Sequence, residues 1–546
     1  MRREEFLVSD DALQDIIDAA EKKKTYGSGD RCILINLSMV RMQAYWLLPK
    51  ILYAKGMQSV TGAPIVALIW GENPRLTGFF DAFGIRLMSL EKMNGRHPFC
   101  LLRACLKTCG FYLTGGSGEG LQRLKLGDIV IGDKLYEDIL RTSPLSTIRS
   151  AWNGICLKKI VHLLWTLYSL REELKKLNAE LCVADDVAYH EGAFLKLLHS
   201  FPIAVFACNS EEERPLAIEE NGDVQTYFSY HRERYVRFLS ETGEKETEWV
   251  DAYLEAKSRG ENGRDIDRGA YKDKRVLNRE EFCRRFGADP KKKNALLLAH
   301  TFSDGVFNHG KYAFRDYYDW LENSLRIAGD VKDVNWIVKP HPTRHLYDEA
   351  ADSVEKLFAR YRTENMFFLP DEISAESIAH IADVLFTVGG NGGAEFACRG
   401  IPPVIAGKPY YRGFGFTIEP KDREAYAACM RRASSIPPLT ETQILAAKRI
   451  YYLRMHFVDC MEYPFADAFA DMMNAGYGQI SDAMAKAYFA GNAGTEPYNS
   501  DVFRKAAAYF RQNGWENTAY YRAGVARAEG VARAEGVAHE EEAPRS

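Results

Sequence analysis

The sequence predicts an α/β protein that folds as two domains, each around a mostly parallel sheet. Short apolar segments alternate with amphipathic segments up to about residue 210, and the same alternation returns from Asn294. A charged stretch separates the two series, and 546 residues exceed what one hydrophobic core supports. Strands that alternate with helices are typical of parallel sheets, because a crossover helix connects each pair of parallel strands.

The first domain is expected over residues 1–210. Ser9 can cap a helix whose apolar residues, from Leu13 to Ala20, recur at helical spacing. The segment DDVAYHEGAFLKLL predicts a loop and a helix between two strands. The segments that predict strands in this domain are CILINLS, APIVALIW, GDIVIG, ELCVA and PIAVFAC.

The rest of the chain is expected to form four further parts. Residues 211–292 are charged and mostly helical in pattern, which predicts a helical connecting segment. The second domain is expected over 293–425, where ALLLAH, VNWIVK, MFFLP, DVLFTV and PPVIAG predict strands. Helices over 426–490 are expected to pack back toward the first domain. Over 491–546 the unit GVARAE recurs, and because each glycine costs a helix about 1 kcal/mol we expect a partly disordered tail.

Composition excludes several classes of partner. Lys and Arg number 71 against 75 Asp and Glu, so no basic excess is present to neutralise nucleic-acid phosphates. No apolar run reaches the ~20 residues that span a bilayer, and the first residues, MRREEFLVSDDALQD, lack the apolar region of a secretory signal. The eleven cysteines are scattered and fit no zinc pattern. We therefore expect a cytoplasmic protein with reduced thiols and no nucleic-acid partner.

A glycine-rich loop, GGNGG, follows the apolar segment that ends at Val388. Glycine lets a ligand approach the backbone closely, and the free N–H groups at a helix start attract anions. We expect the backbone of Asn391, Gly392 and Gly393 to contact a phosphate; the alternative is a tight strand–helix turn without a ligand. Glu395 follows in the first turn of the predicted helix, where it either complements the helix dipole or accepts hydrogen bonds from ribose hydroxyls.

Two further strand ends carry groups that suit a phosphate. Lys339 and His341 follow the segment VNWIV in the run KPHPTRH, and prolines on both sides hold the backbone of the histidine. His300 and Ser303 follow ALLLA. The carboxyl ends of parallel strands open on one edge of a sheet, so one phosphate-bearing ligand explains all three loops. No Asp-x-Asp element stands at a strand end, and we expect neither a metal nor a cofactor.

The KPHP loop and the segment GGNGGAEFACRGIPPVIAGKPYYRGFGFT resemble bacterial capsule polysaccharide biosynthesis proteins. These are surface-carbohydrate glycosyltransferases of GT-B type and are Kdo-transferase-like. The resemblance covers most of residues 30–430, and the matching positions include Asn391, Glu395, Gly407 and the run GFG after Tyr411. Asn391 stands where several relatives carry Ser-Thr.

The resemblance implies a GT-B-like fold, in which two Rossmann-like domains face each other across a cleft. It implies a metal-independent glycosyltransferase that moves a sugar from a nucleotide-sugar donor to a growing capsule or lipopolysaccharide glycan. His341 would bind or protonate the leaving phosphate, and Glu395 would hold the ribose. The implied partners are the donor, a glycan or glycolipid acceptor, and the assembly machinery of the inner membrane, with which the protein would associate peripherally.

The acceptor would lie against the first domain, where a carboxylate must remove a hydroxyl proton. Our choice for this base is Asp186, because it follows the strand segment ELCVA and precedes a predicted helix. Asp133, Asp185 and Glu191 stay open as alternative bases.

Two other functions fit the same pattern. A non-hydrolysing nucleotide-sugar epimerase shares the two-domain architecture, and a catalytically silent glycan-assembly protein would bind glycan but leave the donor intact. Release of free nucleotide on adding an acceptor distinguishes a transferase from an epimerase. The sequence leaves the nucleotide, the sugar, the acceptor, the anomeric outcome and the oligomeric state undetermined.

Overall fold

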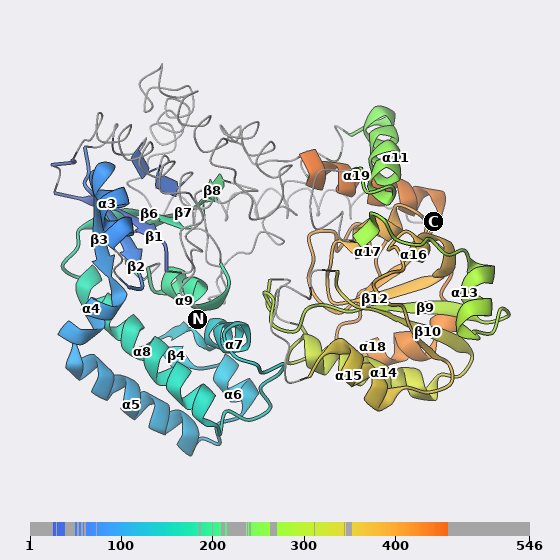
Figure 1. Cartoon of the computed structure of the whole chain (residues 1–546), viewed down its shortest axis with the longest axis horizontal. Coiled ribbons are helices and arrows are strands. Elements are labelled where there is room, and N and C mark those ends of the chain that lie inside the picture. The colour runs from blue at the N-terminus through green and yellow to red at the C-terminus, as the bar shows by residue number, and fades with distance from the viewer. Residues whose placement is uncertain are drawn as a thin grey trace, which may run out of the picture.

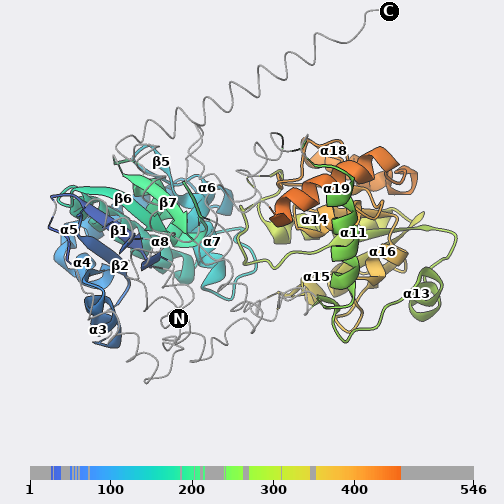
Figure 2. The ribbon, with the colours of Figure 1, turned by 90° about the horizontal axis from the view of Figure 1, so that it is seen from above.

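The computed structural model describes residues 26–456 with gaps, of which the longest are 39–49, 216–235, 262–269 and 345–351. The helix expected after Ser9 and the tail expected over 491–546 lie outside the described residues. The described part forms two α/β units side by side (Figure 1, Figure 2). Each is built on one sheet of mainly parallel strands, so the predicted fold class, with two Rossmann-like sheets, is confirmed.

The first sheet has the strand order β3-β2-β1-β6-β7-β8. All neighbours pair in parallel except β7 and β8, which are antiparallel. The central strands are apolar and fully buried because helices cover both faces of the sheet. The strands are β1 (Cys32–Asn36), β2 (Ile65–Ile69), β3 (Ile85–Ser89), β6 (Ala179–Ala184), β7 (Ala204–Cys208) and β8 (Glu213–Pro215).

Seven described helices belong to the first unit. Among them α5 and α8 run side by side along its outer side (Figure 1), and α7 packs on α9. Their bounds are α3 (Pro74–Ala82), α4 (Leu90–Arg96), α5 (Pro98–Leu113), α6 (Gly118–Gln122), α7 (Gly132–Arg141), α8 (Gly154–Leu174) and α9 (Tyr189–Leu198).

The segment GDIVIG does not join the parallel sheet, contrary to our expectation. Its β5 (Ile129–Val130) pairs only with β4 (Lys125–Leu126), in an antiparallel hairpin. Gly127 turns the chain between them at φ +64°, a left-handed conformation that favours glycine. Helix α7 then starts at Gly132, so Asp133 lies in the first turn of a helix rather than at the end of a sheet strand.

The second sheet is entirely parallel and has the order β11-β10-β9-β12-β13. The five strands match the five predicted apolar segments. They are β9 (Lys293–Leu298), β10 (Val334–Lys339), β11 (Met366–Phe368), β12 (Val384–Thr387) and β13 (Pro403–Ile405). The helices around them are α14 (Tyr317–Asp330), α15 (Val354–Tyr361), α16 (Ser377–Ile381), α17 (Gly392–Ala397), α18 (Arg423–Arg431), η3 (Ala433–Ser435) and α19 (Glu441–His456).

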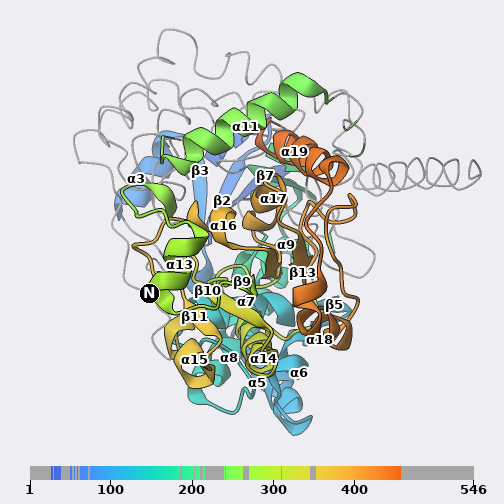
Figure 3. The ribbon, with the colours of Figure 1, turned by 90° about the vertical axis from the view of Figure 1, so that its right-hand side faces the viewer.

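The connecting segment supplies α11 (Glu244–Ser258) and α13 (Arg279–Phe286). Both pack on the second unit. Phe282 of α13 lies in one buried cluster with Leu296 and Ile337 of the second sheet, and α11 lies beside α19 over α17 (Figure 3). The predicted domain limits at 210, 292 and 425 stay predictions.

The described C-terminal helices pack on the second unit and not, as we expected, toward the first. Helix α18 contacts α14, and α19 contacts α17 and α11. The reason is the apolar side of α19, where Ala447, Ile450 and Leu453 bury against Ala394 and Ala397 of α17. Residues 457–490 lie outside the described residues. Among the described helices, none is long and apolar enough to cross a bilayer.

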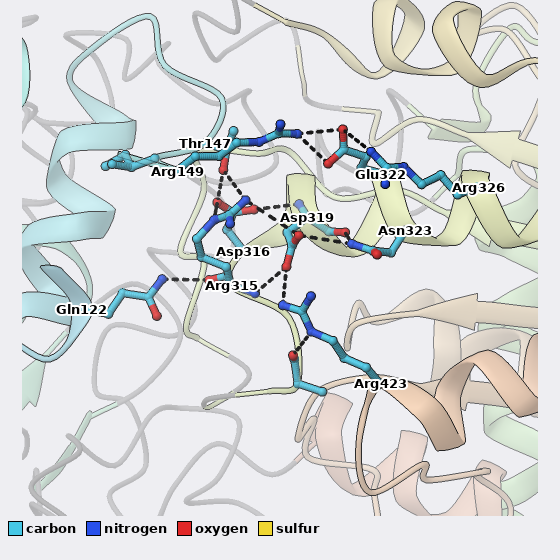
Figure 4. Close-up of polar contacts among 12 residues, drawn as sticks. Gln122, Thr147, Arg149, Arg315, Asp316, Asp319, Glu322, Asn323, Arg326 and Arg423 are labelled. Carbon is cyan, nitrogen blue, oxygen red and sulfur yellow. Dashed lines mark hydrogen bonds and ion pairs between the residues drawn. The ribbon is translucent and has the colours of Figure 1, made fainter. Parts of the chain in front are cut away.

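A polar seam joins the two units (Figure 4). Asp316 caps α14 by accepting a hydrogen bond from the N–H of Asp319, at 2.7 Å. Its other oxygen accepts hydrogen bonds from the hydroxyls of Tyr136 and Thr147 in the first unit. Asp316 is fully buried, and this burial raises the pKa of its carboxyl, while the charge of the neighbouring Arg315 opposes the shift. The units are therefore held by a buried carboxylate whose partners come from both.

Replacing Asp316 should lower the free energy of unfolding more than replacing an exposed helix cap does. We expect Asp316→Ala to lower the free energy of unfolding by about 2–4 kcal/mol, because it removes a cap and leaves buried hydroxyls without an acceptor. The matched control is Asp422→Ala, which removes the exposed cap of α18 and should cost about 1 kcal/mol. Urea denaturation measures both losses, and equal losses would contradict the role of the seam.

Candidate functional site

Each sheet has one topological switch point, where the chain changes direction across the sheet. In the first sheet β6 returns to pair with β1, and in the second β12 returns to pair with β9. Open parallel sheets bind ligands at the carboxyl ends of the strands that flank such a point. The loops after these four strands are therefore the places to look for a site.

At the switch point of the second sheet, His300 lies against the glycine loop. It follows β9, and its Nε2 is 3.0 Å from Oγ1 of Thr387, the last residue of β12. The ring stacks on Tyr317, with ring centroids 4.3 Å apart. A Cβ atom on Gly390 would approach His300 Cε1 to 3.4 Å. Ser303, also predicted, is buried in the same loop. Two of the three predicted loops thus meet here.

The loops after β6 and β9 meet across the two units. The hydroxyl of Tyr189, the first residue of α9, donates to Asp304 Oδ1 at 2.9 Å and accepts from the N–H of Gly305 at 3.1 Å. Glu137 holds the same junction, because its carboxylate accepts from the N–H of Tyr189 at 3.2 Å and from that of Phe307 at 2.7 Å. The carboxyl ends of the two sheets are therefore directed at one another.

His341, from the third predicted loop, belongs to the same electrostatic environment. Burial lowers the pKa of its imidazole; the charge of Asp304 acts in the opposite direction, and that of Arg344 supports the lowering. A lowered pKa keeps the imidazole neutral at pH 7, so that one ring nitrogen donates a hydrogen bond and the other accepts one. Asp304 thus interacts with Tyr189 of one unit and with His341 of the other.

The glycine loop has a packing role as well. A Cβ on Gly392 would come within 2.6 Å of Leu298 Cδ2, and one on Gly393 within 2.1 Å of the Tyr411 hydroxyl. That hydroxyl donates to the carbonyl of Gly390 at 2.9 Å. The tight-turn alternative therefore accounts for these two glycines, while Asn391 is the exposed residue of the loop.

Glu395 contacts two residues of the connecting segment, and the role expected for it at a ribose stays a prediction. One oxygen accepts from Lys257 Nζ at 2.8 Å, and the other accepts the hydroxyl of Tyr271. All three side chains are buried. Both partners come from the connecting segment, so Glu395 anchors α11 and the residues that follow it to α17.

Lys339 is also held by the protein itself. Its ammonium donates to the carbonyls of Pro370 and Ile373, each at 2.9 Å. Burial lowers the pKa of this lysine to about 8. Lys339 therefore fixes the turn after β11, and its expected contact with a phosphate stays a prediction.

The expected bases of the first unit are partly described. Asp185 and Asp186 lie outside the described residues. Asp133 Oδ2 accepts from Lys196 Nζ at 2.7 Å, and both side chains are buried where α7 packs on α9. Glu191 is fully buried in the first turn of α9. Burial inside the first unit argues against Asp133 and Glu191 as bases that meet an acceptor.

Sequence reasoning missed a histidine–aspartate pair at the switch point of the first sheet. His190 Nδ1 lies 2.6 Å from Asp138 Oδ1, and Nε2 lies 3.1 Å from the carbonyl of Ser38, which follows β1. Trp70 Nε1 is 3.2 Å from the same nitrogen. Burial acts to raise the pKa of Asp138, but His190, Lys159 and His162 together lower it. The pair was not recognised because the partners stand 52 residues apart in two unrelated segments.

No group of three histidine, cysteine, aspartate or glutamate side chains within the described ranges is arranged to hold a metal ion. Comparison of the sequence with protein families and with curated proteins identifies no relative. No protein-family model and no curated protein matches the chain.

Solved structures align with the chain only distantly. KpsC of Thermosulfurimonas dismutans, a beta Kdo 2,4 transferase, has 14% identity and a TM-score of 0.30, and the match covers 50% of this chain and 79% of that one. The glycotransferase of kitacinnamycin has 14% identity, a TM-score of 0.25 and coverages of 83% and 99%. The UDP-GlcNAc 2-epimerase of Neisseria meningitidis, bound to UDP-GlcNAc, has 11% identity and a TM-score of 0.19, and the match covers 83% of this chain and 97% of that one. At these values we draw no conclusion from the alignments; the fold class rests on the strand order of the two sheets.

The buried contacts of Glu395 predict that replacing it destabilises the folded protein. Glu395→Leu should lower the free energy of unfolding by about 3–5 kcal/mol, because it removes the carboxylate that compensates a buried ammonium. Adding Lys257→Met should recover most of that loss. The control is Asp251→Ala, which removes a 57% exposed carboxylate from its pair with Lys448 between α11 and α19 and should cost less than about 1 kcal/mol. Unchanged stability with lost nucleotide binding would instead support the ribose role.

The lowered pKa of His341 predicts a pH-dependent stability. In the unfolded chain the imidazole titrates near its ordinary pKa of 6.5, and in the folded protein it titrates lower. Its contribution to stability is therefore complete above pH 6.5 and is lost as the pH falls toward the folded pKa. Denaturation of the wild type and of His341→Gln across this range should give curves that converge as the pH falls. Parallel curves would contradict a lowered pKa.

Proposed function

We propose that the protein transfers a sugar from a nucleotide-sugar donor to a hydroxyl group of a glycan acceptor. The observation that carries this proposal is the contact of Tyr189 with Asp304 and Gly305. It joins the carboxyl ends of the two sheets, so that a ligand at the second switch point lies next to the first unit. A transfer reaction needs such a junction, because donor and acceptor must meet with their reacting atoms close together.

The donor is assigned to the second unit. Its phosphates would contact the loop around Asn391 and lie near His300, at the ends of β9 and β12. His341 is neutral without a ligand, and a phosphate anion beside it would raise the pKa of the imidazole. The imidazolium then stabilises the charge that develops on the leaving phosphate, or protonates it. Ser303, Gly392 and Gly393 support this loop arrangement through packing.

The acceptor is assigned to the first unit. Its hydroxyl oxygen attacks the anomeric carbon as the bond from that carbon to the phosphate oxygen breaks. The hydroxyl proton goes to a base, for which we retain Asp186, three positions before Tyr189 in the chain. The His190–Asp138 pair, close to that position, positions the start of α9.

The motifs KPHP and GGNGGAEF support a more specific version of the proposal. On their resemblance to capsule polysaccharide proteins, the product is a capsule or lipopolysaccharide glycan and the reaction needs no metal. The protein would then act in the cytoplasm, beside the assembly machinery of the inner membrane.

The donor site is tested by thermal shift with CMP, UDP, GDP, CDP and TDP on the full chain. One nucleotide should raise the melting temperature, with about 2.7 kcal/mol of stabilisation at a hundred times its Kd. His341→Ala should weaken that affinity about ten- to hundredfold, the usual effect of losing a charge-assisted hydrogen bond. The matched control is His380→Ala, a half-exposed histidine on α16, which should bind as the wild type does. No shift with any nucleotide would contradict the proposal.

Product analysis with the matching nucleotide sugar separates the three functions. Free nucleotide that appears only when a panel of synthetic glycolipid acceptors is added indicates a transferase. An inverted sugar configuration without an acceptor indicates an epimerase, and an intact donor in both cases indicates a binding protein. Either of the last two results would overturn the proposal.

A further inference from the structure

The outer side of the first unit carries an exposed apolar face. It is formed by α5 and by the residues at the start of α8, and Figure 1 places α5 on the side of this unit that faces away from the second unit. Seven of the eleven exposed large hydrophobic residues in the described part of the chain belong to it. This face consists of Phe99, Leu102, Leu106, Leu113, Trp152, Ile155 and Leu157.

The spacing on α5 shows that the exposure is systematic. Cys100, Ala104, Thr108 and Phe111 form the buried side of the helix, which packs on α8. The exposed apolar residues of α5 follow one another at intervals of three, four and seven positions, so they form a stripe along the other side of the helix. Phe99 is 81% exposed, and Leu113 is 89% exposed. Several exposed apolar residues gathered on two neighbouring helices mark an interaction site, whereas single exposed hydrophobic residues do not.

The aromatic residue of this face is held in place. Trp152 is 66% exposed, yet its Nε1 donates to the carbonyl of Gly115 at 3.0 Å. Its ring lies 4.6 Å from that of Tyr112, and the Tyr112 hydroxyl donates to the carbonyl of Ala151 at 2.7 Å. The tryptophan is therefore fixed in an exposed position and loses little conformational freedom on binding.

The charges beside the apolar face are cationic. Helix α5 contains Arg103 and Lys107 and neither Asp nor Glu, and Lys158 follows Leu157 at the start of α8. Two acidic groups are near, and both have basic partners: Glu172 lies 3.9 Å from Arg103, and Glu173 lies 2.6 Å from Nε2 of His97 and 3.1 Å from Nζ of Lys176. Phe and Leu next to Arg and Lys on one helix, with an exposed Trp beside it, are typical of surfaces that lie in the interface of a membrane.

We propose that this face docks on a phospholipid bilayer with anionic headgroups, with α5 parallel to the membrane surface. The charges favour this occupant over a second copy of the chain. A symmetric dimer would bring two copies of this cationic face together. Anionic headgroups instead neutralise its charges. The proposal goes beyond the proposed transfer reaction and does not depend on it.

Vesicle flotation with the full chain tests the proposal. The wild type should bind vesicles of phosphatidylcholine with phosphatidylglycerol, bind pure phosphatidylcholine vesicles less, and bind less as salt is raised. Arg103→Gln should lower the partition coefficient about fivefold, and Leu106→Ser about tenfold. The matched control is Leu445→Ser, which changes an exposed leucine on α19 of the second unit and should bind as the wild type does. Melting curves establish that each variant is folded.

Three results would overturn the proposal. The first is failure of the folded wild type to bind either kind of vesicle. The second is an equal loss of binding in Leu106→Ser and Leu445→Ser. The third is a wild-type dimer in light scattering that Leu106→Ser dissociates, because a second copy would then be the occupant of the face.

Discussion

Besides the Asp316 seam, a second buried carboxylate, that of Glu137 on α7, joins the two units by connecting the loops after β6 and β9. One oxygen accepts a hydrogen bond from the N–H of Phe307. The other accepts hydrogen bonds from the N–H of Tyr189 and the ammonium of Lys134. Burial raises the pKa of Glu137, and the charge of Lys134 opposes that rise. A buried charge is tolerated only where such partners replace water. Here two of the partners are backbone groups of the loops after β6 and β9, so the cost of burial is offset by joining the two switch points.

The consequence for the site follows from Tyr189. Its φ of +55° lies in the left-handed region, which costs a non-glycine residue about 1–3 kcal/mol. A glycine would avoid that cost but would lack the hydroxyl that reaches Asp304 and Gly305. Glu137 holds the N–H of the same residue. The fold therefore gives up stability at Tyr189 to direct a first-unit side chain at the loop that contains Asp304 and Gly305.

Sequence patterns predicted the elements of the second unit but only part of the site. Each strand of that sheet is a short apolar run followed by a loop, so periodicity identified β9 to β13, and strand-end reasoning placed His300 beside the glycine loop. It could not identify the partners of Glu395, because Lys257 and Tyr271 stand 138 and 124 residues away in a charged segment without a clear pattern. For Lys339 the partners are backbone carbonyls, which no sequence motif records. The hairpin of GDIVIG was mistaken for a sheet strand because a short apolar run fits both.

Hydrogen–deuterium exchange of the full chain, with and without the nucleotide that raises its melting temperature, tests most directly whether the two switch points form one site. Peptides that cover 299–305 and 387–393 of the second unit should exchange more slowly with the ligand. In the same experiment, peptides that cover 187–192 of the first unit should also be protected, because Tyr189 and Glu137 connect the two loops. Protection that is confined to one unit, or that appears away from the ends of β6, β9 and β12, would contradict a site shared between the two sheets.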